Sequence, residues 1–323
     1  MSQYQIPNPS NQHIPQLLNI FKALLFPVLI LCGFLLSDYI AVKFDSHSIA
    51  KQGAFYWFIL KWFVIGLIAV INTVLLAGMG ILAHDGVHRV LFKNKVVNDI
   101  ASSLLSIHAL LPFYANRQFH LNHHSYAHQP GKDPEEVIHN RPFLLALVMG
   151  PFFGLAAQYQ IMLRNIIGAM NRKKLFRAGA DLLSLTIAGL SYFYWLPKTG
   201  VELKNTIVPL LAVLPLVYNY RAISDHYGLA AVVRKSQRQV NLDEADNKTL
   251  QEETSGWIVK TTPLLQWIWS NVNYHEVHHK FPYLSYQYLP EVYDKTREQL
   301  NYKVVNGYTR SLLNLRNKAY YQN

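Results

Sequence analysis

The sequence predicts an all-α integral membrane protein with four transmembrane helices in two hairpins, additional interfacial helices and a histidine-rich cap on the cytoplasmic side. Three observations lead to this fold class. Hydrophobic residues make up 51% of the 323 residues and charged residues only 15%, against about 25% charged in an ordinary soluble protein. The apolar residues are concentrated in segments long enough to cross a bilayer. Nine of the fourteen histidines gather in four short clusters, each just beyond an apolar segment.

The first hairpin is expected to consist of residues 17–42 and 62–83. The first of these segments contains only two ionisable side chains and fits a crossing that bends at Pro27. The second is uncharged, and as a helix it would reach roughly 33 Å, enough to span the hydrocarbon core. This crossing would bring the first histidine cluster to the membrane surface.

The second hairpin has to be chosen from three apolar stretches, 143–163, 182–197 and 206–220. Histidine clusters that share one site must lie on one side of the membrane, so only two of these stretches can cross it. Gly150 and Pro151 interrupt the first stretch. We therefore expect it to be interfacial or re-entrant and the other two stretches to form the hairpin.

Another apolar stretch, residues 99–113, is too short to span the membrane. It is expected to be an interfacial helix that begins near Asn98 or Asp99.

The chain divides into three parts by composition. Residues 1–15 are expected to be a flexible tail, residues 16–295 a membrane domain and residues 296–323 a cytoplasmic C-terminal tail. A polar insert at residues 231–260 is expected either to cap the site or to be a simple loop.

The basic residues indicate the orientation. The formal net charge is +11, and no nucleic-acid-binding motif accompanies it, so cytoplasmic loops that face anionic lipid explain the charge better than a nucleic-acid partner. The expected outer loops are short and weakly basic, whereas the segments around the histidine clusters are rich in Lys and Arg. This asymmetry places the clusters and both termini in the cytoplasm.

The four clusters carry the candidate chemistry. They consist of His84 and His88, of His120, His123 and His124, of His226, and of His275, His278 and His279. On a helix, residues three and four apart share a face, so each cluster can direct its rings to one side. Nine imidazoles exceed the four ligands of a tetrahedral zinc ion and suit two metal ions with open positions. Imidazole ligands are compatible with Zn, Cu, Fe or Ni, and two metals beside an apolar cavity favour iron.

Residues near the clusters are weaker candidates. Asp85, Asp225 and Glu276 each adjoin a histidine of a cluster and are candidates to accept hydrogen bonds from the outer ring nitrogens, although each is also compatible with a solvated carboxylate. His128 has the spacing of a spare ligand. The remaining histidines match no ligand spacing and are His13, His47, His108 and His139.

At these clusters the chain resembles the membrane fatty acid desaturase family, in the broad group that also contains alkane monooxygenases and carotenoid hydroxylases and ketolases. The family's three histidine motifs are similar to residues 84–88, 120–124 and 275–279, the last followed by the aromatic-proline pair Phe281-Pro282. Asp225-His226 resembles its additional single-histidine motif, in which Glu is more usual than Asp. The resemblance covers roughly residues 17–295.

The resemblance implies a non-haem di-iron centre held by the nine clustered histidines, with O2 as co-substrate. Electrons would come from a separate ferredoxin or cytochrome, because no fused cytochrome signature is present. The implied reaction introduces a double bond into a fatty acyl chain that is linked to lipid, CoA or a carrier protein.

Other functions stay open at this stage. A hydroxylase or ketolase of a carotenoid or another apolar lipid would use the same ligand set. A zinc membrane hydrolase would need fewer histidines and an acidic ligand, and a metal transporter would hold its ligands near the bilayer midplane. Both of these fit the pattern less well.

Overall fold

The computed structural model describes residues 6–8, 11–50, 54–139, 141–167, 172–229 and 254–318. Most of these residues are helical, as the sequence predicts. The described part also contains one small two-stranded sheet, which was not predicted. Of the expected polar insert, residues 231–253 lie outside the described residues.

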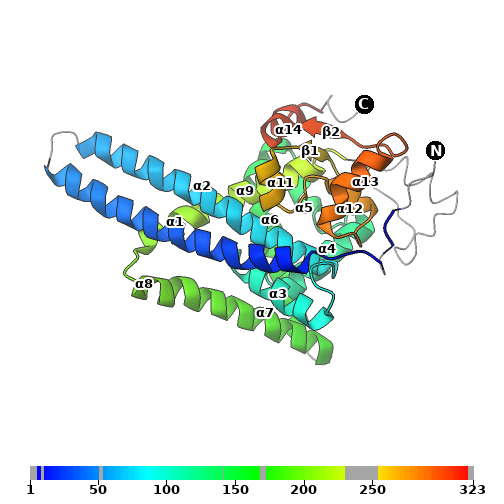
Figure 1. The fold of residues 1–323 in the computed structure, drawn as a ribbon, viewed down its shortest axis with the longest axis horizontal. Coiled ribbons are helices and arrows are strands. Elements are labelled where there is room, and N and C mark those ends of the chain that lie inside the picture. Colours follow the sequence, from blue (N-terminus) through cyan, green and yellow to red (C-terminus); the bar gives the residue numbers. More distant parts are fainter. Residues whose placement is uncertain are drawn as a thin grey trace.

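The first hairpin consists of α1 (Gln16–Ala50) and α2 (Ala54–Val87). The two helices lie side by side and antiparallel (Figure 1). α1 continues through Pro27. Both helices are longer than the expected crossings. The expected bounds are therefore corrected: the first helix continues beyond residue 42 to Ala50, and the second continues beyond residue 83, so that His84 lies in the last turn of α2.

Four helices of the described chain are long and apolar enough to cross a membrane, namely α1, α2, α6 (Phe143–Ile167) and α9 (Ile207–His226). The number of candidate membrane-spanning helices agrees with the sequence prediction, but one of the four helices is not the predicted one. α6 is in this set, and the predicted stretch 182–197 is not.

α6 is continuous, so the predicted interruption at Gly150 and Pro151 is wrong. Pro151 has no N–H group, and the carbonyl of Leu147 therefore loses its helical partner. The amide of Asn219 on α9 compensates, because its Nδ2 donates to the carbonyl of Leu147 and to that of Ala146, the latter at 2.9 Å. Gly150 permits this approach, since a Cβ there would lie 2.9 Å from Asn219 Oδ1.

The stretch 182–197 belongs to a second long helical segment. α7 (Arg172–Leu190), the π-helical turn η1 (Ser191–Trp195) and α8 (Leu196–Lys198) follow one another without a break. This segment leads away from the cap, and α9 returns to it (Figure 1). The connecting turn packs against the distant part of α1, where Ser37 Oγ donates to Asn205 O at 2.5 Å.

The cap lies at one end of the long helices (Figure 1). Its elements are α3 (Lys95–Ile107), α4 (Phe113–Tyr126), α5 (Glu136–His139), β1 (Ile258–Lys260), α11 (Pro263–Ile268), α12 (His275–Lys280), η3 (Tyr286–Tyr288), α13 (Leu289–Thr296), β2 (Val304–Asn306) and α14 (Tyr308–Leu315). β1 and β2 are parallel, with Val259 paired to Val305. Both of these side chains are buried with Trp257 and Tyr308 in a core cluster.

α3 begins earlier than predicted. Its N-cap is Asn94, whose side chain accepts from Val96 N and Val97 N. Asn98 lies inside the helix, where its amide is used for a contact with α2. The predicted start near Asn98 or Asp99 is therefore wrong, because two nearby asparagines fit the same capping pattern.

The N-terminal segment and α1 are both attached to the cap. Gln12 Nε2 donates to Tyr283 O at 2.5 Å, and Gln12 Oε1 accepts from Ser285 N at 2.9 Å. Lys22 is buried, and its Nζ donates to Trp267 O at 2.5 Å. The charge of Lys22 near the start of α1 therefore faces protein rather than lipid.

We expect Asn219→Ala to lower the free energy of unfolding by about 1–3 kcal/mol, because it leaves the Leu147 carbonyl without its donor. Pro151→Ala restores a backbone N–H, so the cost of Asn219→Ala should be smaller in that background. Thermal unfolding of the four proteins in detergent tests this coupling. Equal costs in both backgrounds would contradict the compensation.

Candidate metal centre

The first cluster is positioned by a close contact between α2 and α3. Gly86 packs against Ser102, and a Cβ at Gly86 would come within 1.7 Å of Ser102 Oγ. Asn98 Nδ2 donates to Gly86 O at 2.8 Å and holds the last turn of α2. His84 in this turn and His88 just beyond it therefore lie side by side, with ring centroids 5.3 Å apart.

The second cluster lies on α4, and α7 holds the N-terminus of this helix. Pro112 at the N-cap makes no side-chain cap hydrogen bond. Asp181 of α7 supplies the acceptor instead, at 2.8 Å from Tyr114 N and 3.0 Å from Ala115 N. A carboxylate at this position also interacts favourably with the positive end of the helix dipole.

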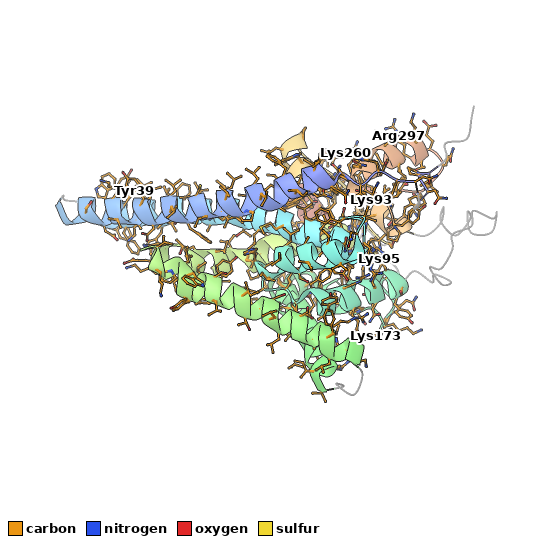
Figure 2. The ribbon with its side chains drawn as sticks, turned by 60° about the horizontal axis from the view of Figure 1, so that its bottom comes forward. Tyr39, Lys93, Lys95, Lys173, Lys260 and Arg297 are labelled. Atoms are coloured by element: carbon orange, nitrogen blue, oxygen red, sulfur yellow. The ribbon has the colours of Figure 1, made fainter. Side chains whose placement is uncertain are left out.

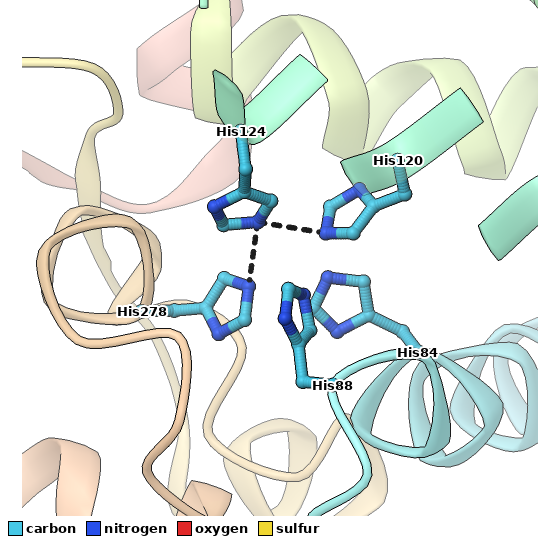
Figure 3. Close-up of side chains that lie close together, drawn as sticks. All are labelled: His84, His88, His120, His124 and His278. Carbon is cyan, nitrogen blue, oxygen red and sulfur yellow. Dashed lines mark hydrogen bonds between the residues drawn. The ribbon is translucent and has the colours of Figure 1, made fainter. Parts of the chain in front are cut away.

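Five histidines form the first group, which Figure 3 shows. It consists of His84, His88, His120, His124 and His278, with one ring nitrogen of each within 4.8 Å of the others. His124 Nε2 lies 2.8 Å from His120 Nε2 and 3.1 Å from His278 Nε2. The end of α2, helix α4 and helix α12 thus direct imidazoles into one space.

The other four predicted histidines form a second group beside the first. Ring nitrogens of His123, His226 and His279 lie within 4.8 Å of one another. His275 Nε2 lies 2.7 Å from His226 Nε2 and 3.1 Å from His279 Nε2. The rings of His124 and His279 stack across the boundary between the groups, with centroids 4.2 Å apart. The structure therefore brings all nine histidines together.

The chemistry of these groups fits metal ions. Both ring nitrogens of His84 and Nε2 of His88 are buried and make no hydrogen bond to any described residue. A neutral imidazole has a single N–H, so tightly packed rings cannot all act as donors for one another. Because buried polar atoms normally have partners, a cation that accepts several lone pairs suits this arrangement.

Burial also keeps the rings neutral. It lowers the pKa values well below the usual value for histidine, and neighbouring rings or arginines lower them further, for His88, His120, His124, His275, His278 and His279. At neutral pH these imidazoles keep the lone pair that a metal ion needs.

The loop residues Asp133 and Ser255 accept hydrogen bonds from the outer ring nitrogens of two histidines. Asp133 contacts His123 Nδ1 through both carboxylate oxygens, at 2.9 and 3.1 Å. His226 Nδ1 donates to Ser255 O at 3.1 Å. Such contacts fix the ring orientation and direct Nε2 toward the metal position.

The three carboxylates that the sequence singled out have other partners. Asp225 forms an ion pair with Arg221 Nε at 2.8 Å. Glu276 accepts from Ser255 N at 2.8 Å and pairs with a lysine of its own helix, so it supports His226 through Ser255. Asp85 lies 4.0 Å from His84 Nδ1, which is too long for a hydrogen bond.

Sequence reasoning missed Asp133 and Glu135. Glu135 lies 3.8 Å from His120 Nδ1, and it is also 3.8 Å from His226 Nε2 in the second group. The one available signal was the acidic run of residues 133–136 soon after the second cluster. His128, the predicted spare, binds Ser255 O through Nε2 at 2.9 Å and belongs to neither group.

A largely apolar cavity adjoins the two groups, between α2, α4, α6 and α9. Its volume is about 220 Å³. Four histidines line it, namely His84, His120, His226 and His275, together with apolar side chains that include Ile81, Leu111, Phe119, Phe152 and Leu214. The cavity thus places apolar walls directly beside both histidine groups.

Comparisons with known proteins agree with the resemblance seen in the sequence. The family model described as fatty acid desaturase matches residues 60–308. A search of curated proteins finds no match. The matched segment is more than half of the chain and contains all nine clustered histidines, and the chain therefore belongs to the fatty acid desaturase family.

Proposed function

We propose that the protein is an oxygen-dependent, membrane-bound di-iron oxidoreductase that introduces a double bond into a fatty acyl chain. The observation that carries this proposal is that four of the clustered histidines, two from each group, line an apolar cavity. Nine imidazoles in groups of five and four leave open positions on two metal ions. Family membership supports an oxidoreductase and a lipid substrate.

The chain's residues bind and orient the reactants. When bound, two iron ions supplied with O2, two electrons and two protons provide the oxidising power to remove two hydrogens from adjacent carbons, giving an alkene and two waters. Ile81, Phe119 and Leu214 in the cavity wall would hold the acyl chain and exclude water. Asp133 and Ser255 would keep the rings of His123 and His226 in place.

We further propose that α1 with α2, and α7 with α9, form the two membrane-spanning hairpins. Although α6 is apolar enough to span, its side-chain contacts near both ends are with helices that carry clustered histidines. Near its start, its carbonyls accept from Asn219, two turns before His226, and Asn165 near its end donates to Gln118 on α4 at 3.4 Å. A helix with both ends beside the cap suits the membrane interface.

The charge distribution supports a cytoplasmic cap. Figure 2 shows five basic residues at the cap end, whereas Tyr39 lies toward the other end. The five are Lys93, Lys95, Lys173, Lys260 and Arg297. Segments rich in Lys and Arg remain in the cytoplasm. The same surface suits an acidic ferredoxin or a cytochrome as electron donor.

We expect purified protein to contain about two iron ions per chain, and His123→Ala to contain about one, since it removes a ligand of one group. Elemental analysis by mass spectrometry measures both. His13→Ala is the matched control, because His13 is exposed and outside both groups. One zinc ion and no iron in the unaltered protein would exclude the di-iron proposal.

The reaction is tested by lipid profiling of a bacterial host that also expresses a ferredoxin and its reductase. Acyl chains that have lost two hydrogens should appear with the unaltered chain and be absent with His278→Ala, while both proteins reach the membrane fraction. A gain of one oxygen instead would indicate a hydroxylase. Unchanged acyl lipids with an iron-loaded protein would argue against a fatty acyl substrate.

The topology predicts opposite labelling of two exposed lysines, Lys173 at the start of α7 and Lys198 at the end of α8. In a Cys32→Ser background, Lys198→Cys should react with an impermeant maleimide added outside the cell. Lys173→Cys should react only after permeabilisation. Labelling of both from the same side would show that α7 and α8 do not cross the membrane.

A further inference from the structure

A second cavity, of about 630 Å³, lies on the other side of α4. Gln118, Leu121 and Asn122 of α4 line it, and they share one helix face because they are three and four residues apart. The α4 histidines at 120, 123 and 124 occupy the opposite face. The cavity shares no lining residue with the apolar cavity of the candidate metal centre. It is therefore a separate site.

The lining of this second cavity is strongly basic. Its charged residues are Arg89, Arg117, Lys173, Arg177 and Asp99. The single carboxylate, Asp99, lies 3.3 Å from Arg117, and these two side chains are only 19% and 18% exposed. Arg89 and Arg177 form no ion pair within the described part of the chain. The cavity thus has an excess of positive charge.

The basic side chains also act on one another. Burial lowers the pKa of the Arg117 guanidinium, and the nearby charges of Arg89 and Arg177 lower it further, against the opposing effect of Asp99. Arg89 has φ 62°, a conformation in which glycine is less strained than arginine. A bound anion would relieve the repulsion among these cations.

Apolar surface flanks the cavity on two helices. On α3, Val96 is 66% exposed and Ile100 is 57% exposed. On α7, Phe176 lines the cavity and is 68% exposed, and Leu183 is 62% exposed. α3 and α7 run beside each other below α4 (Figure 1). An anion that enters this cavity therefore has apolar helix faces next to it.

We propose that this cavity binds the phosphate group of an anionic phospholipid, whose acyl chains lie along the exposed faces of α3 and α7. Arginine and lysine side chains give strong charge-assisted hydrogen bonds to phosphate oxygens. The flanking apolar surface favours a lipid over a soluble phosphate. Asp181 ties α4 to α7 beside the cavity, so the lipid would add a second link between the helix that carries three histidines and its neighbour.

The test uses purified, metal-loaded full-length protein and native mass spectrometry. Phosphatidylglycerol and phosphatidylcholine with identical acyl chains are offered in equal amounts. The unaltered protein should retain phosphatidylglycerol preferentially. The double variant Lys173→Gln/Arg177→Gln should bind it about tenfold more weakly or worse, because two charged donors are lost. Arg177→Lys keeps the charge and should retain most of the preference.

The matched control is Lys295→Gln/Arg297→Gln, which removes the same charge from exposed positions at the C-terminal end of α13. It should bind phosphatidylglycerol like the unaltered protein. Iron content measured on every variant reports on the metal centre separately. The proposal is wrong if the two lipids bind equally, or if the control loses as much affinity as the cavity variant. Displacement of phosphatidylglycerol by an equal concentration of inorganic phosphate would overturn the lipid assignment.

Discussion

The packing of nine imidazole rings into one buried space is the constraint on which the rest of the structure depends. Ring nitrogens approach within 2.7–3.1 Å of one another in both groups, and neutral imidazoles have one N–H each. Lone pairs that face each other repel unless a cation lies between them. The rings therefore have to be held in place by the protein, and that need explains the polar contacts around the site.

These polar contacts act at the ends of helices. Asn98 holds the last turn of α2, and Asp181 holds the first turn of α4. Asn219 replaces the hydrogen bond that Pro151 removes from α6. In each case a side chain from one element satisfies a backbone group of another, and a buried backbone group without a partner costs free energy. The arrangement of the helices around the rings is therefore specified by buried amide and carboxylate groups in addition to apolar packing.

The same contacts explain what the sequence could predict. Helical spacing and apolar length are local properties, so the nine histidines and the first hairpin could be identified from the residues themselves. The continuity of α6 could not, because Pro151 is compensated by a residue 68 positions away. Asp133 could not be identified because its contact with His123 depends on how the intervening loop folds back. Strands β1 and β2 have three residues each, too few for a periodic signal.

Helix α4 connects the two halves of this arrangement. One face carries three of the nine histidines, and the opposite face borders the basic cavity. Successive residues on a helix are rotated by about 100°, so a small rotation of α4 would turn all three rings away from the other six. Asp181 fixes only the first turn of α4, whereas the histidines lie in its second half. A ligand that bridges α4 and α7 farther along would oppose that rotation. Leu121 and Asn122 line the basic cavity and lie between His120 and His123 on α4, so a ligand in this cavity meets that requirement.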